Sequence, residues 1–96
     1  MKIKDLRNGM KSVDVEAKVL EKEATREVMS RYKNETYQVA NVIIKDDTGQ
    51  IKLTLWNEMI GQVNENDTVK VENGYVTSFR GEIQLNVGRY GKLTVM

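Results

Sequence analysis

Hydrophobic and polar residues alternate with a period near two along most of this chain. Over residues 13–19, every second residue is apolar and most of the residues between are charged. The same alternation recurs over residues 51–56, 68–72 and 82–87, and residues 36–45 are rich in β-branched side chains. A period of two places apolar side chains on one face of a half-buried strand. The pattern therefore predicts five β-strands.

The segments between these strands carry turn and loop signals. Asp46-Asp47-Thr48-Gly49 predicts a tight hairpin in which aspartate makes local hydrogen bonds, and Phe79-Arg80-Gly81-Glu82 predicts a second tight turn. The polar residues 24–35 predict a long loop or an extended hairpin. Residues 57–63 predict a short helical connection with Asn57 as its N-cap.

The number and order of these elements indicate a small all-β barrel. Five short strands, with a short helical connection between strands 3 and 4, match the OB-fold, a five-stranded Greek-key barrel. The chain has 96 residues, which suits one domain. We therefore expect a single OB-fold domain over residues 1–96, with its barrel core at about 12–95.

The composition argues against catalysis and against bound cofactors. The chain has no cysteine and no histidine, which removes disulfides, thiol nucleophiles, imidazole bases and most zinc sites. It also has no phosphate-binding P-loop and no GxGxxG motif. No apolar run approaches the roughly 18 residues of a membrane helix. We expect a non-enzymatic, cytoplasmic (nucleoid-associated) protein with no metal and no cofactor.

Three aromatic residues are predicted on a face that is otherwise polar. In the third strand, Trp56 falls opposite the core set that ends at Leu55. In the fourth, Asn73-Gly74 interrupts the alternation as a β-bulge does, which shifts the phase by one residue. Tyr75 and Phe79 then share the outer face. The alternative is structural: Trp56 closes the barrel end, and the other two rings belong to the core if no bulge forms.

An exposed aromatic trio on a polar sheet suits unpaired bases. Stacking on an aromatic ring contributes about 1–3 kcal/mol per base and tolerates any sequence, while nearby cations hold the phosphates. The predicted nucleic-acid-binding residues are Trp56, Tyr75 and Phe79 for stacking, Lys52, Thr54, Thr77, Gln84 and Asn86 on the same face, and Arg26, Arg31, Lys33, Arg80 and Arg89 as further cations.

Net charge alone argues weakly against nucleic acid. The formal charge is only +1, but its distribution is uneven. Residues 37–79 carry a net −3, whereas residues 24–36 carry +1 and residues 80–96 carry +2. Two alternatives therefore stay open. The aromatic face can dock onto a partner protein, or the domain can bind single-stranded RNA, because stacking alone does not distinguish RNA from DNA.

Two segments resemble archaeal single-stranded DNA-binding proteins. One is Ile51-Lys52-Leu53-Thr54-Leu55-Trp56 after Asp47-Thr48-Gly49, and the other is residues 74–81 followed by Gln84-Leu85-Asn86-Val87-Gly88. The similarity runs from about Val13 to Lys92 and extends to simple single-OB proteins of eukaryotes and to OB domains of replication protein A.

The resemblance implies base stacking at Trp56, Tyr75 and Phe79. Crenarchaeal members carry tryptophan where this chain has Tyr75, which implies the same binding mode with slightly weaker binding. Eukaryotic relatives carry an aromatic residue at Asn86, where this chain can offer only a hydrogen bond. The implied function is protection of single-stranded DNA in replication, recombination or repair, with repair or replication proteins as further partners.

Overall fold

The computed structural model describes residues 1–29 and 35–96, and the side chains of all of these except 88–90. The elements in chain order are η1 (Ile3–Asp5), β1 (Val13–Lys22), β2 (Arg26–Met29), β3 (Thr36–Lys45), β4 (Gln50–Trp56), α1 (Glu58–Gln62), β5 (Thr68–Phe79) and β6 (Glu82–Val95). Within these described ranges, no helix is both long and apolar enough to cross a membrane.

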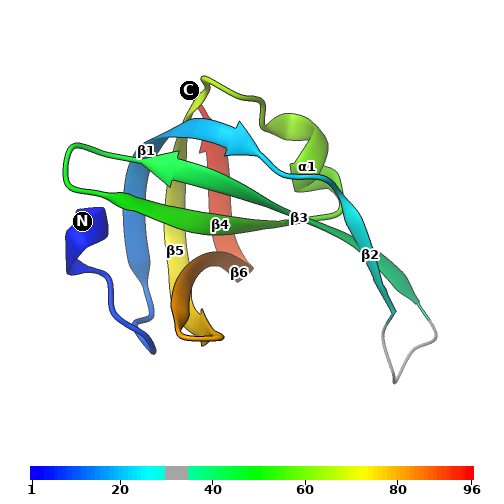
Figure 1. Cartoon of the computed structure of the whole chain (residues 1–96), viewed down its shortest axis with the longest axis horizontal. Helices are drawn as coiled ribbons and strands as arrows, with labels where there is room; N and C mark the ends of the chain where they lie inside the picture. Colours follow the sequence, from blue (N-terminus) through cyan, green and yellow to red (C-terminus); the bar gives the residue numbers. More distant parts are fainter. Residues whose placement is uncertain (30–34) are drawn as a thin grey trace.

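Five of the strands close into a barrel, which confirms the predicted OB-fold. Hydrogen bonds join the strands in the order β1-β5-β6-β4-β3, and a further pairing between β1 and β3 completes the ring (Figure 1). The short β4–β6 pairing is parallel, and the others are antiparallel. The ring leaves an inner face for the core and an outer face for solvent or ligand.

The segment predicted as a loop or extended hairpin contains an additional strand. The β2 strand pairs with β3, so that Arg26 lies opposite Val39 and Met29 opposite Thr36. Together, β2 and β3 extend away from the barrel (Figure 1). The extended-hairpin interpretation is therefore correct. Because of this strand, α1 lies between β4 and β5 rather than between a third and a fourth strand.

The predicted inner face is the core. Residues of β1 alternate between buried and exposed from Val13 to Leu20, as a half-buried strand requires. The fully buried large side chains are Leu6, Ile44, Leu53, Leu55, Leu85, Val13, Val19, Val42, Val63, Val69, Val71 and Val76.

The predicted bulge lies at Asn73-Gly74. The pairing of β5 with β6 shifts between Glu72 and Gly74, and Val76 beyond the shift is buried. A Cβ at Gly74 would lie 2.9 Å from the carbonyl oxygen of Asn86, so this position excludes any side chain. The bulge therefore turns the following alternate residues, Tyr75 among them, to the outer face.

The Asp46 turn confirms the prediction of local hydrogen bonds. Oδ1 of Asp46 accepts hydrogen bonds from the backbone N–H groups of Thr48 (2.7 Å) and Gly49 (3.1 Å). Its Oδ2 accepts one from Ile3 at 2.8 Å, which ties the N-terminal η1 to this turn. Partial desolvation raises the pKa of Asp46, but a hydrogen bond from the Thr48 hydroxyl and these backbone hydrogen bonds outweigh it and lower the pKa to about 2.

Asn57 occupies the predicted N-cap position, but its side chain does not cap the helix. Asn57 directly precedes α1 but makes no side-chain cap hydrogen bond. Its Oδ1 instead accepts a hydrogen bond from the backbone N–H of Gln38 at 3.0 Å, and its own N–H donates to the Gln38 carbonyl at 2.8 Å. These two bonds fasten the end of β4, just after Trp56, to the neighbouring strand β3.

Candidate nucleic-acid interface

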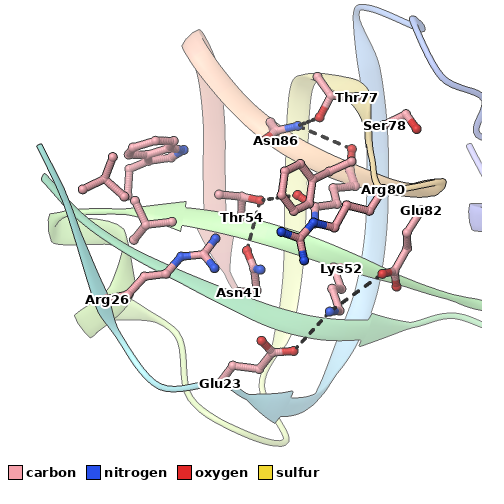
Figure 2. A pocket seen from close by; sticks show the side chains of 15 residues that line it. Glu23, Arg26, Asn41, Lys52, Thr54, Thr77, Ser78, Arg80, Glu82 and Asn86 are labelled. Atoms are coloured by element: carbon pink, nitrogen blue, oxygen red, sulfur yellow. Dashed lines mark hydrogen bonds and ion pairs between the residues drawn. The ribbon is translucent and has the colours of Figure 1, made fainter. Parts of the chain in front are cut away.

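A groove of about 480 Å³ opens on the outer face of the barrel. Its walls come from the β1–β2 connection, from β2, and from the turn between β5 and β6 (Figure 2). Its floor comes from β3, β4 and β6. The lining residues are Glu23, Arg26, Val28, Val39, Asn41, Lys52, Thr54, Trp56, Thr77, Ser78, Phe79, Arg80, Glu82, Gln84 and Asn86.

The floor is a row of small polar side chains on adjacent strands. Asn41 lies opposite Thr54 in the β3–β4 pairing, and Thr54 lies opposite Asn86 in the β4–β6 pairing. All three are buried, with exposed fractions of 7%, 5% and 7%. Thr54 and Asn86 therefore lie on the predicted face but are buried there.

Hydrogen bonds connect this floor without using all of its polar atoms. The Thr54 hydroxyl lies 3.2 Å from Oδ1 of Asn41, and Nδ2 of Asn86 donates to the Thr77 hydroxyl at 3.0 Å. Among the described residues, Nδ2 of Asn41 and Oδ1 of Asn86 form no hydrogen bond. Every fully enclosed side-chain polar atom of these residues has a partner, so these two atoms are not fully enclosed. One amide donor and one amide acceptor are therefore open to whatever occupies the groove.

The three predicted stacking residues are all exposed, so the alternative that placed them in the core is wrong. The exposed fractions are 37% for Trp56, 39% for Tyr75 and 59% for Phe79. Trp56 and Phe79 both line the groove. Tyr75 lies outside this lining, opposite Asn86 on the neighbouring strand. The groove thus brings two rings of the trio together, and the third extends the same sheet face.

Trp56 contacts an aromatic neighbour. The rings of Tyr37 and Trp56 meet edge to face, with centroids 6.4 Å apart and planes at 82°. The Tyr37 hydroxyl donates to Glu35 at 2.8 Å, which holds the second ring in place. A hydrogen bond to the ionised Glu35 also raises the pKa of Tyr37. The indole that lines the groove therefore has an aromatic neighbour within the sheet.

Two arginines reach into the groove without an acidic partner. Arg26 comes from β2 and Arg80 from the β5–β6 turn, and Figure 2 shows both side chains extending into the space between them. The guanidinium carbon of Arg80 lies 5.2 Å from the Phe79 ring centroid, as in a cation–π contact. No carboxylate in the described part of the chain forms an ion pair with either arginine.

The backbone at Arg80 has a positive φ, which is unfavourable for most residues other than glycine. The two turn residues, Arg80 and Gly81, have φ values of +53° and +79°. Positive φ at both positions is typical of the tight hairpin turns that prefer asparagine, aspartate and glycine. Non-glycine residues in sparsely populated conformations cluster at functional sites. An arginine here places a cation above the groove at some cost in stability.

Lys52, a third predicted cation, is already paired. Its Nζ lies 3.6 Å from Oε1 of Glu23 and 3.9 Å from Oε2 of Glu82. Both acidic residues also line the groove. Two negative charges therefore compete with any phosphate for this lysine.

The remaining predicted cations cannot be placed in the site. Arg31 and Lys33 lie outside the described residues, and the side chain of Arg89, in β6, is outside them as well.

Sequence reasoning also missed six lining residues: Glu23, Val28, Val39, Asn41, Ser78 and Glu82. Of these, only Asn41 had a visible signal, because it is a lone polar residue within the run Val39-Ala40-Asn41-Val42-Ile43-Ile44.

Comparison with known proteins agrees with this geometry. Residues 6–95 match the model of a family described as single-stranded DNA binding protein Ssb-like, OB fold. The chain belongs to this family. It is 38% identical over 92 residues to the single-stranded DNA binding protein Ssb of Saccharolobus solfataricus. That match covers 96% of this chain and 61% of the relative, so the chain spans about three fifths of the relative's length.

Solved archaeal OB domains have the same fold. An OB domain from Thermoplasma acidophilum is 25% identical with a TM-score of 0.85, covering 100% of this chain and 85% of that one. The second OB-fold domain of replication protein A from Methanococcus maripaludis is 28% identical with a TM-score of 0.80, covering 100% and 93%. The resemblance seen in the sequence is confirmed, and the family is one of single-stranded DNA-binding proteins rather than of enzymes.

Proposed function

We propose that this domain binds single-stranded DNA with little dependence on sequence, and protects it during replication, recombination or repair. The observation that carries this proposal is the pairing of two features in one groove. Trp56 and Phe79 offer exposed rings, and Arg26 and Arg80 offer cations that form no ion pair within the described part of the chain. Aromatic platforms beside a positively charged track are the common means of holding single strands.

The stacking rings set the path of the strand. One base stacks on Trp56 and another on Phe79, and a third stacks on Tyr75 where the strand leaves the groove. Each such stack contributes about 1–3 kcal/mol before the cost of ordering the strand. Since every base has a flat π-face, this arrangement accepts any sequence.

The amide floor adds hydrogen bonds without a fixed code. Nδ2 of Asn41 is a donor and Oδ1 of Asn86 an acceptor, and both are open to the groove. Thr77 and Gln84 lie on the same surface. A pyrimidine and a purine each carry both donors and acceptors on their edges, so this floor can satisfy either. Its contribution is to hold bases that are already stacked.

Phosphates are held by the arginines, and no reaction follows binding. Arg26 and Arg80 flank the groove, where they can contact the backbone of a strand that runs between them. Within the cell, we expect the domain in the cytoplasm, on exposed single strands of the nucleoid.

The test is a titration of the protein with oligo-dT, followed by the emission of the single tryptophan. We expect strong quenching that weakens as salt rises, by roughly 0.7 log units of affinity per log unit of salt for each neutralised phosphate. Duplex DNA of the same length serves as the control and should quench weakly. Absence of quenching and of binding to oligo-dT would contradict the proposal.

The same titration separates the two alternative functions. Tighter binding of oligo-rU than of oligo-dT would favour an RNA-binding function, because stacking alone does not distinguish the two strands and a preference for RNA needs contacts to the 2′-OH. Absence of binding to either strand would indicate that the aromatic face meets a protein.

A further inference from the structure

The groove contains negative charge where a DNA-binding surface needs positive charge. Glu23, Lys52 and Glu82 form a cluster across one side of it, which we call the acidic clamp. We propose that the acidic clamp limits the affinity of the groove for single strands by occupying Lys52 and repelling phosphates. This inference rests on the proposed function and adds a determinant of its strength.

Three separate elements build the acidic clamp. Glu23 follows β1, and its backbone N–H donates to the carbonyl of Asn41 at 2.9 Å, which fixes its position beside the floor. Lys52 lies in β4, and Glu82 is the first residue of β6. Figure 2 shows Lys52 between the two carboxylates, joined to each. The cluster therefore bridges the β1–β2 connection and the β5–β6 turn.

The ion pairs of the acidic clamp are exposed to solvent, so they are weak enough to break when a phosphate binds. The side chains of Glu23, Lys52 and Glu82 are 37%, 30% and 60% exposed. Exposed ion pairs contribute about 0–1 kcal/mol because water screens the charges and the side chains lose entropy. A phosphate can therefore replace a carboxylate as the partner of Lys52.

Opening the acidic clamp does not remove its charges. When Lys52 turns to a phosphate, the carboxylates of Glu23 and Glu82 stay in the lining of the groove that the DNA would occupy. Like charges repel within the screening length of about 8–10 Å at physiological salt. Neither Arg26 nor Arg80 forms an ion pair with a carboxylate of the described residues. The two arginines should therefore contribute to affinity, whereas Lys52 contributes little while the two glutamates remain.

The test removes the negative charges and measures binding to oligo-dT by tryptophan quenching. We expect Glu23→Gln and Glu82→Gln each to tighten binding roughly two- to fivefold, the size of one exposed charge interaction. The matched control is Glu27→Gln, which removes the same charge from β2 at a position outside the groove lining. It should change affinity by less than about twofold.

Lys52→Ala supplies the second readout. In the otherwise unchanged protein, we expect it to weaken binding by less than about twofold. In the Glu23→Gln, Glu82→Gln double variant, we expect the same substitution to weaken binding roughly fivefold. The salt dependence of the double variant should also steepen by roughly 0.7 log units per log unit of salt, as one more phosphate is neutralised.

Three outcomes decide between the explanations. Glutamine variants that match Glu27→Gln, or that bind more weakly than the unchanged protein, would overturn the acidic clamp while leaving the proposed function in place. Failure of the unchanged protein to bind oligo-dT would overturn both. Thermal unfolding checks the fold of each variant, which we expect to be intact because exposed ion pairs stabilise little.

Discussion

The two ends of the β3–β4 hairpin use polar residues in opposite ways. At the turn, both carboxylate oxygens of Asp46 are occupied by hydrogen bonds from Ile3, Thr48 and Gly49. At the other end, Trp56 is 37% exposed beside an amide floor with open donors and acceptors. Both ends contain internal hydrogen bonds, but only the groove end leaves amide atoms, Nδ2 of Asn41 and Oδ1 of Asn86, without a partner among the described residues.

The difference separates residues that hold the fold from residues that await a ligand. A polar group that the chain itself satisfies, such as Asp46, contributes stability and offers nothing to a partner. Guanidinium groups without an ion pair and exposed rings contribute little to the stability of the fold. They gain favourable contacts only when a ligand binds. Substitutions at the two ends should therefore change different quantities.

The largest expected effect is at the groove end. Trp56→Ala should weaken oligo-dT binding by about 1–3 kcal/mol, because it removes one stacking platform. Phe79→Ala should follow closely, and Tyr75→Ala should cost less because Tyr75 lies outside the groove lining. Anisotropy of a labelled oligo-dT measures all three, since the first variant has no tryptophan. A Trp56→Ala protein that binds normally would contradict the comparison, and Trp56→Phe is the matched control that keeps a ring.

The next effect belongs to the turn end and to stability. Asp46→Ala leaves the N–H groups of Ile3 and Thr48 without their partner, so we expect about 1–2 kcal/mol lower free energy of unfolding. Oligo-dT affinity should stay unchanged. Asp47→Ala is the control, because its ion pair with Lys2 is highly exposed and contributes little. Urea unfolding measures both, and equal losses would argue against a special role for Asp46.

Arg80 sharpens the comparison, because one substitution should raise the stability of the fold and lower the affinity for oligo-dT. Arg80→Asn replaces a residue at positive φ with one that this turn favours, so we expect roughly 0.5 kcal/mol more stability. The loss of a groove cation should weaken oligo-dT binding by roughly 0.5–1 kcal/mol and flatten its salt dependence. Unfolding and binding measured on the same variant check this, and parallel changes in both would disagree with it.

The smallest effect is the acid dependence of stability. The pKa of Asp46 is about 2 in the folded chain against an ordinary value of 3.8, so the contribution of its ionised carboxylate to the free energy of unfolding is complete above about pH 4. The contribution is lost as the pH falls from about 4 toward 2. Because the turn is partly exposed, we expect the free energy of unfolding to fall by less than about 1 kcal/mol at pH 3. Asp46→Asn should flatten this part of the curve, and thermal melts from pH 7 to pH 2 measure it.

The residue pattern predicted the barrel and the outward turn of the aromatic rings. The phase shift at Asn73-Gly74 was readable because glycine and asparagine interrupt an otherwise regular alternation. It alone placed Tyr75 and Phe79 on the outer face, and the shift in pairing confirms it. The alternation of residues and its interruption were therefore enough to predict which side chains of these strands face outward.

Other features depend on contacts that no local pattern contains. Thr54 is buried because Asn41 and Gln84, 13 and 30 residues away, close around it. The β2 strand is entirely exposed, so it has no alternation to detect and forms only by pairing with β3. Asn57 has the residue type of an N-cap, but Gln38 takes its side chain. The acidic clamp likewise exists only once three distant elements meet.

The most direct measurement is the change in amide and indole chemical shifts when oligo-dT is added to the labelled protein. We predict that the Trp56 indole N–H and the amides of Thr54 and Arg80 shift strongly. The amides of Thr48 and Gly49, at the far end of the same hairpin, should stay in place. Shifts concentrated at that turn, or an unmoved Trp56 indole in a protein that binds, would contradict the account.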